Sequence, residues 1–121
     1  MSEFQQSIKA LERQLRILRE IKSERDRQDD LKMAGRFPHI CADLELSHGD
    51  RLTILMEEIG EACEEMLALK RIGTVGDARR NLKKELVQCG AVIVGWIEAV
   101  EKEEEIRSFN AAANKQWERG K

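Results

Sequence analysis

Five glutamates lie within nine consecutive residues near the middle of the chain, in the stretch EEIGEACEE. At about 100° per residue they share one sector of a helix, and none has a lysine or arginine four residues further on. Like-charge pairs at this spacing repel by roughly 0.2–0.5 kcal/mol each, and a bound divalent cation would reverse the sign of that cost. A solvated helix face is the alternative, and the stripe alone leaves the two interpretations even. The five are Glu57, Glu58, Glu61, Glu64 and Glu65.

A second polar pair lies at the start of the most apolar stretch of the chain, residues 86–100. Glu85 and Gln88 are three residues apart and share a helix face there. A carboxylate carried into a buried helix is costly unless it is paired or bound to metal. Two helices joined by a short turn run antiparallel, so the glutamate stripe can face Glu85. Oxygen-only ligands of this kind suit Mg²⁺ or Mn²⁺ and not zinc.

The two stretches together resemble the MazG-like, all-α nucleotide pyrophosphohydrolases. That family carries E-E-x-x-E and, after one helical hairpin, E-x-x-D; here the motifs are EEIGE at 57–61 and ELVQ at 85–88. The surrounding text, RLTILMEEIGEACEEMLALK and NLKKELVQCGAVIVGWIEAV, is similar to small MazG-related proteins of phage and bacteria. The resemblance covers roughly residues 51–100, and the flanks are not diagnostic.

The resemblance implies a Mg²⁺ site, with Mn²⁺ as the alternative ion. Glu57 and Glu65 are the implied candidates to orient or deprotonate water. Gln88 departs from the family pattern, which has aspartate there; an amide oxygen can coordinate Mg²⁺ but brings no charge and cannot act as a base. The metal ligands carried over by position are Glu58, Glu61, Glu85 and Gln88.

The implied reaction is hydrolysis of an NTP or dNTP to the monophosphate and pyrophosphate, serving to clean the nucleotide pool. Trp96 shares the face of Glu85 and is a candidate to stack on a base, although a core tryptophan is the commoner case. Four cations near the start of the same helix are candidates to hold phosphates, with ordinary surface charge as the better interpretation of each one alone. They are Arg79, Arg80, Lys83 and Lys84.

Helical periodicity predicts the elements that position these residues. Ser2 with Gln5 predicts a capping box for a first helix over 1–34, whose apolar seam gives way to a charged, solvated back half. Residues 35–46 form an ordered connection, and Ser47 caps a second helix over roughly 48–70. The seam needs a partner helix, from this chain or another copy, and consists of Phe4, Ile8, Leu11, Leu15 and Leu18.

The third helix is expected over roughly 77–101, after a turn in IGTVGD. It is apolar on nearly all sides from residue 86 onward, which is typical of a buried helix, and Gly90 and Gly95 would let neighbouring backbones approach. Residues 102–121 suggest a fourth helix or a C-terminal arm. The second helix has a broad apolar face opposite its acidic sector, with Leu55, Ile59, Ala62, Cys63, Met66 and Leu67.

Length and composition fit one all-α domain over residues 1–121, a four-helix-type MazG-like bundle built around the 47–101 hairpin. The 121 residues are 41% hydrophobic and 36% charged, and no alternating β-branched run favours a sheet. The hairpin alone covers the third helix poorly, so we expect a homodimer or tetramer. The formal net charge of -2 argues against a nucleic-acid partner.

The cysteines and the termini bound the remaining classes. Cys41, Cys63 and Cys89 are odd in number, lie far apart and form no C-x-x-C pair, so a reducing compartment without disulfides is favoured. A metal site at His39 and Cys41 would lack two further ligands, so a loop histidine and a loop thiol are the preferred interpretation. No signal peptide or membrane span is expected, which predicts a cytoplasmic protein. Two alternatives stay open: a non-catalytic nucleotide-binding or scaffolding module, favoured by the loss of a ligand at position 88, and a plain structural bundle with an acidic face. Base and sugar preference do not follow from the sequence.

Overall fold

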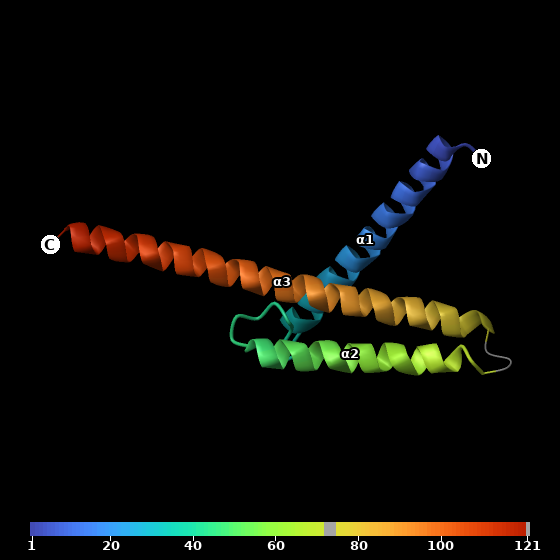
Figure 1. The fold of residues 1–121 in the computed structure, drawn as a ribbon. Coiled ribbons are helices and arrows are strands. Elements are labelled where there is room, and N and C mark those ends of the chain that lie inside the picture. Colours follow the sequence, from blue (N-terminus) through green and yellow to red (C-terminus); the bar gives the residue numbers. More distant parts are fainter. Residues whose placement is uncertain (72–74, 121) are drawn as a thin grey trace.

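Three α-helices account for almost all of the described part of the chain, residues 1–71 and 75–120 of a computed structural model. Helix α1 spans Glu3–Met33, α2 spans His48–Ala68 and α3 spans Val75–Arg119. Helices α2 and α3 run antiparallel, and α1 crosses α3 (Figure 1). The described residues form no strand, so the expected all-α class is confirmed. None of the described helices combines the length and apolar character that crossing a membrane requires.

Both predicted helix starts are confirmed as capping boxes. The Gln5 amide nitrogen donates to Ser2 Oγ at 3.2 Å, and the Ser2 amide donates to Gln5 Oε1 at 3.0 Å. Ser47 and Asp50 form the same reciprocal pair at 3.0 and 3.1 Å before α2. Each pair satisfies two backbone donors that a helix start leaves without a partner. Helix α1 ends just before Gly35, whose φ of +74° is a conformation that favours glycine.

Within the single chain, helix α1 packs through its back half and not through its apolar seam. Its charged back half lies against α3, while its apolar front half projects away from the other helices (Figure 1). Arg25 is buried at the crossing, where its guanidinium donates twice to Glu98, at 3.0 Å each, and once to Asp29 at 2.6 Å. The prediction of a solvated back half was therefore wrong for the side that faces α3, because a buried arginine with two carboxylate partners looks like surface charge in a sequence.

Small residues of α3 make this crossing close, as predicted. A Cβ at Gly90 would lie 3.0 Å from Cδ1 of Ile21 in α1. A Cβ at Gly95 would lie 3.4 Å from the backbone nitrogen of Ala42 and 3.4 Å from Arg25 Nε. Both glycines thus allow another segment to approach the α3 backbone closely.

The connection between α1 and α2 is held by Arg51, which is fully buried. Its guanidinium donates to the carbonyl oxygens of Cys41 at 2.9 Å and Asp43 at 2.8 Å, and to Glu103 Oε1 of α3 at 3.2 Å. The Cys41 thiol donates to the Arg51 carbonyl at 3.6 Å, and burial raises its pKa to about 11. These contacts make Cys41 a packed thiol and do not suggest a metal ligand.

Helix α3 differs from the prediction in its length and in its burial. It continues without a break to Arg119, so residues 102–119 extend α3 and do not form a fourth helix. It is also buried on one side only: Ala91 and Ala99 are inaccessible, whereas Ile93 and Ile97 are exposed. The predicted turn at 72–77 lies partly outside the described residues, since 72–74 are not among them.

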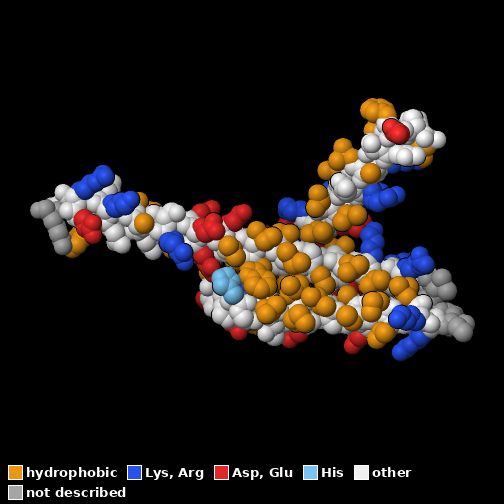
Figure 2. Space-filling view, in the orientation of Figure 1, with side chains coloured by type: hydrophobic (Ala, Val, Ile, Leu, Met, Phe, Trp, Pro, Cys, Tyr) orange, Lys and Arg blue, Asp and Glu red, His pale blue; other side chains and the backbone are white. Residues whose placement is uncertain are grey.

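One side of the hairpin presents a continuous apolar surface, which we call the apolar face (Figure 2). It includes Ile59, Met66 and Leu67 of the apolar α2 face that the sequence predicted. In the single chain Glu58 and Glu65 of the acidic sector are half-buried, whereas the other three glutamates of that sector and the apolar face are exposed. The apolar face consists of Leu52, Met56, Ile59, Met66 and Leu67 of α2 with Leu86, Ile93 and Ile97 of α3.

Candidate metal centre

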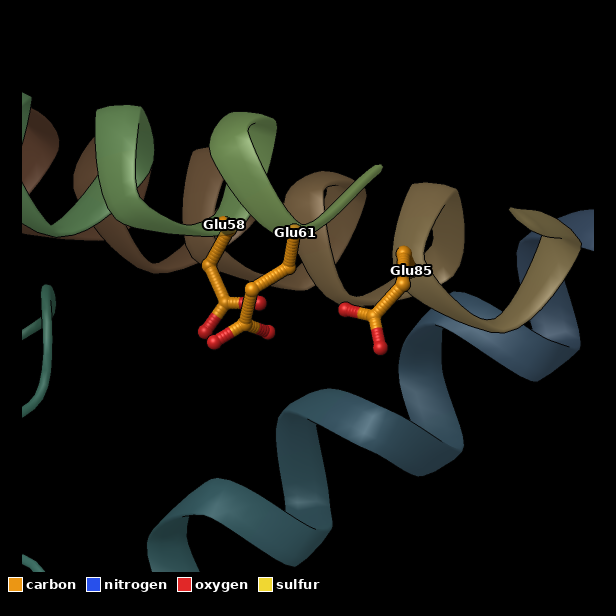
Figure 3. A group of neighbouring side chains, drawn as sticks. All are labelled: Glu58, Glu61 and Glu85. Carbon is orange, nitrogen blue, oxygen red and sulfur yellow. The ribbon is translucent and has the colours of Figure 1, made fainter. Parts of the chain in front are cut away.

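The three predicted glutamate ligands converge in the space between the hairpin and α1 (Figure 3). Glu58 and Glu61 lie one turn apart on α2, and Glu85 reaches them from α3. One carboxylate oxygen from each lies within 4.8 Å of the others. The antiparallel pairing of α2 and α3 is what brings residues 24 or more positions apart to one point.

Gln88 joins the same cluster through its side-chain amide. With its nitrogen facing the carboxylates, that amide donates to Glu85 Oε2 at 2.7 Å and to Glu58 Oε2 at 3.2 Å. The orientation is the one that satisfies both ends of the amide. All four positions that the resemblance assigned to metal therefore meet, and Gln88 acts as a hydrogen-bond donor between two of the carboxylates.

Burial and mutual repulsion perturb the carboxylates of this cluster. Burial, followed by the charges of Glu61 and Glu85, raises the pKa of Glu58 to about 7. Burial also raises the pKa of Glu85, helped by a hydrogen bond with Glu61 that favours the protonated form. The cluster thus resists holding three negative charges unless a proton or a cation offsets them.

Helix α1 contributes a fourth carboxylate that the sequence analysis missed. Glu24 is largely buried, and its charge adds to those that raise the pKa of Glu58. Arg27 binds it with two hydrogen bonds, Nε to Oε2 at 2.8 Å and Nη2 to Oε1 at 2.7 Å. In the sequence this is an ordinary i,i+3 surface pair, and only the crossing of α1 over the hairpin brings it beside the cluster.

The two candidates to act on water lie on either side of the ligands. Glu57 is exposed and borders a cavity of about 190 Å³ that also reaches Glu58. Glu65 lies one turn beyond Glu61, and its charge raises the pKa of Glu85. The cavity adjoins the cluster and has apolar and aromatic walls, lined in addition by Gln28, Phe37, His39, Ile40, Cys41, Ile54 and Val92.

The predicted phosphate-holding cations differ in what they interact with. The charge of Lys84 opposes the rise in the pKa of Glu85. Lys83 Nζ donates to Glu20 Oε1 of α1 at 3.1 Å. Arg80 pairs loosely with Asp77 at 3.8 Å, and Arg79 is exposed near the start of α3.

Trp96 is not brought to the cluster. Its Nε1 donates to His48 Nδ1 at 2.9 Å, and the two rings stack with centroids 6.1 Å apart. Eleven residues separate Trp96 from Glu85, which corresponds to about 16 Å along the helix axis. Sharing a face of α3 was therefore not enough to put this ring beside the carboxylates.

The donor set fits a hard divalent cation. Three carboxylates offer oxygen ligands of the kind that Mg²⁺ and Mn²⁺ prefer, while the Gln88 amide presents its nitrogen to them. The nearby Cys89 thiol is held in its neutral form, because burial and then the charges of Glu58 and Glu85 raise its pKa. Comparison of the chain with family models, curated proteins and solved structures gives no match.

Proposed function

We propose that the protein is a Mg²⁺-dependent nucleoside triphosphate pyrophosphohydrolase of the MazG-like type. The convergence of Glu58, Glu61 and Glu85 within 4.8 Å is the observation that carries the proposal. Burial of two of these carboxylates and their mutual repulsion favour a bound proton or cation, and the group lies where the two resembling motifs meet. Bound there, Mg²⁺ supplies positive charge that offsets the phosphate oxygens.

Residues around the cluster are assigned to water activation, to contact with the base and to phosphate binding. Glu57 lines the 190 Å³ cavity together with Glu58, where its carboxylate can orient a water and take a proton from it. The cavity wall, with Phe37 and Ile54, offers the base an apolar contact surface. Lys84, beside Glu85, adds a positive charge that favours phosphate near the ligands.

A non-catalytic nucleotide-binding or scaffolding module is the second candidate. The observation that favours it is the Gln88 amide, which donates to Glu85 and Glu58 and so partly satisfies the cluster without a cation. An aspartate at this position would add repulsion instead and would call for metal more strongly. Under this candidate the fold and the cavity persist while turnover is lost.

Oligomer formation completes the proposal. Apposition of the apolar faces of two copies would join two α2–α3 hairpins into a four-helix bundle made by two chains, whereas the sequence predicted a four-helix-type bundle within one chain. A dimer or tetramer assembled in this way keeps the carboxylate cluster on the opposite side of each hairpin, toward its own α1. The cytoplasmic location expected from the sequence stays a prediction.

The deciding experiment is pyrophosphate release from a panel of NTPs and dNTPs with Mg²⁺. We expect release from at least one nucleotide, its loss on removal of Mg²⁺, and a loss of at least 100-fold in a Glu58→Gln/Glu61→Gln variant. Glu64→Gln is the matched control, because Glu64 is an exposed glutamate of the same helix and not part of the cluster. If no pyrophosphate is released from any nucleotide of the panel with Mg²⁺ or Mn²⁺, the non-catalytic module becomes the favoured candidate.

A further inference from the structure

A second cavity, of about 410 Å³, lies between α1 and α3 and is not assigned by the resemblance. We call it the arginine groove. Most of its lining comes from one face of α1, where successive residues three or four apart project together. It is lined by Arg16, Arg19, Glu20, Ser23, Glu24, Arg27 and Val87.

Two of its arginines have guanidinium groups that no carboxylate holds. Among the residues that the structure describes, neither Arg16 nor Arg19 forms an ion pair. The buried arginines behave differently: Arg25 and Arg51 each bind carboxylates, at 2.6–3.2 Å. A groove edged by unpaired guanidinium groups has positive charge available for an anionic ligand.

The arginine groove shares a wall with the carboxylate cluster. Glu24 lines the groove, and its charge contributes to the raised pKa of Glu58. Arg27 also lines the groove and feels the charge of Glu58. Val87, the α3 residue of the groove, lies in the second motif between Glu85 and Gln88. A ligand held at the cluster can therefore extend into the groove.

We propose that the arginine groove binds the β- and γ-phosphates of the substrate and the pyrophosphate that leaves, with Arg16 and Arg19 as the principal donors. This inference rests on the proposed function, because it takes the carboxylate cluster as the place where the α-phosphate is cleaved. Guanidinium groups suit this role, since each can donate two parallel hydrogen bonds to phosphate oxygens.

The groove acts on the leaving group of the proposed reaction. A water oxygen forms a bond to the α-phosphorus as the bond from that phosphorus to the α–β bridging oxygen breaks. The bridging oxygen leaves with the electron pair as part of pyrophosphate, and the water proton passes to a carboxylate base such as Glu57. Negative charge grows on the pyrophosphate in this step, and Arg16 and Arg19 stabilise it.

The test is binding of inorganic tripolyphosphate, measured by calorimetry with Mg²⁺ and again with EDTA. We expect an Arg16→Gln/Arg19→Gln variant to bind tripolyphosphate at least 10-fold more weakly in both conditions, while its melting temperature is unchanged because both side chains are exposed. Arg13→Gln is the matched control, as an exposed arginine of the same helix that does not line the groove. Binding by the double variant within twofold of wild type, or no binding by wild type, overturns the inference.

Turnover separates this inference from the proposed function. If the wild type hydrolyses no nucleotide but binds tripolyphosphate through Arg16 and Arg19, the result supports the arginine groove as a phosphate-binding site and contradicts the proposed reaction. If the wild type is active and the double variant keeps the same KM and kcat, the result supports the proposed reaction and contradicts phosphate binding in the arginine groove. A rise in KM of at least 10-fold, matched by the loss of tripolyphosphate affinity, is the result we expect.

Discussion

The Glu58 carboxyl shows how the candidate centre and the stability of the fold are linked. Its pKa is about 7 in the folded chain, raised from 4.5 first by burial and then by Glu61 and Glu85. The folded state therefore holds this proton more tightly than the unfolded state does. The stabilisation is fully present below pH 4.5 and is lost as pH rises through 7, so the metal-free protein should be less stable at pH 8 than at pH 5.

Glu58→Gln should remove most of that pH dependence. The amide keeps the shape of the side chain without its charge, so we expect a gain of about 1–3 kcal/mol at pH 8 and a much smaller gain at pH 5. Urea unfolding in EDTA at the two pH values measures it, with Glu64→Gln as the control. Adding Mg²⁺ should flatten the wild-type profile and leave the variant unmoved. Equal effects of Glu58→Gln at both pH values would contradict this account of the cluster.

Gln88→Asp tests the same cluster in the opposite direction. A carboxylate in place of the amide removes two donated hydrogen bonds, to Glu85 and Glu58, and adds a like charge. We expect the metal-free variant to melt several degrees lower than wild type at pH 8 and to show a larger rise with Mg²⁺, because ligand binding stabilises the folded state by mass action.

Differential scanning fluorimetry over a Mg²⁺ titration provides the measurement for Gln88→Asp. Gln88→Glu serves as the control, because it adds the same charge as Gln88→Asp on a side chain that is one methylene longer. A variant whose melting temperature responds to Mg²⁺ no more than wild type would indicate that position 88 does not face a cation. A wild type and a variant that both ignore Mg²⁺ would favour the plain structural bundle.

At the scale of the helices, the glycines of α2 and α3 should respond to substitution with opposite signs. A Cβ at Gly60 meets nothing within 4 Å, so Gly60→Ala should stabilise α2 by about 1 kcal/mol through helix propensity. A Cβ at Gly95 meets the Ala42 backbone and Arg25 at 3.4 Å, so Gly95→Ala should lose about 1 kcal/mol or more despite the same gain in propensity. Thermal melts of the two variants give the comparison, and a stabilising Gly95→Ala would contradict the close crossing at α3.

Local patterns predicted the helices and much of the cluster. The capping boxes at Ser2 and Ser47 depend on residues three apart, and helical period plus an antiparallel hairpin was enough to bring Glu58 and Glu85 together. Such features depend only on residues close together in the sequence or on a short hairpin, so they can be predicted from the sequence alone.

Long-range pairing was the part that could not be predicted. The Arg25–Glu98 pair spans 73 residues, and a charged stretch looks the same whether water or another helix covers it. Glu24 and Arg27 were missed beside the cluster for this reason. The continuity of α3 was different: residues 101–119 contain no proline or glycine, so the chain offered no helix breaker where a separate fourth helix or arm was expected to begin.

At the scale of the whole molecule, the single chain exposes more surface than its size requires. Its accessible area is 9484 Å², against roughly 6,700 Å² for a compact monomer of 13.9 kDa. The excess of roughly 2,800 Å² comes from the projecting halves of α1 and α3 and from the open hairpin (Figure 1). Obligate interfaces bury about 2,000–5,000 Å² counted over both partners, which is about 1,000–2,500 Å² per chain, so a large interface with a second copy would remove much of this excess.

The apolar face should therefore be covered by a second copy, and Ile93→Asp/Ile97→Asp should separate the copies. Both side chains are exposed in the single chain and lie on the side of α3 away from the cluster, so charge there disrupts packing between copies without altering the carboxylates. We expect light scattering after size exclusion to give two or four times 13.9 kDa for the wild type and a smaller assembly for the variant. Arg107→Asp, a charge change on the exposed extension of α3, should leave the mass unchanged. A wild type that stays monomeric at 100 µM would contradict the coverage of this face, and retained Mg²⁺ binding by the separated variant would locate the metal centre within one chain.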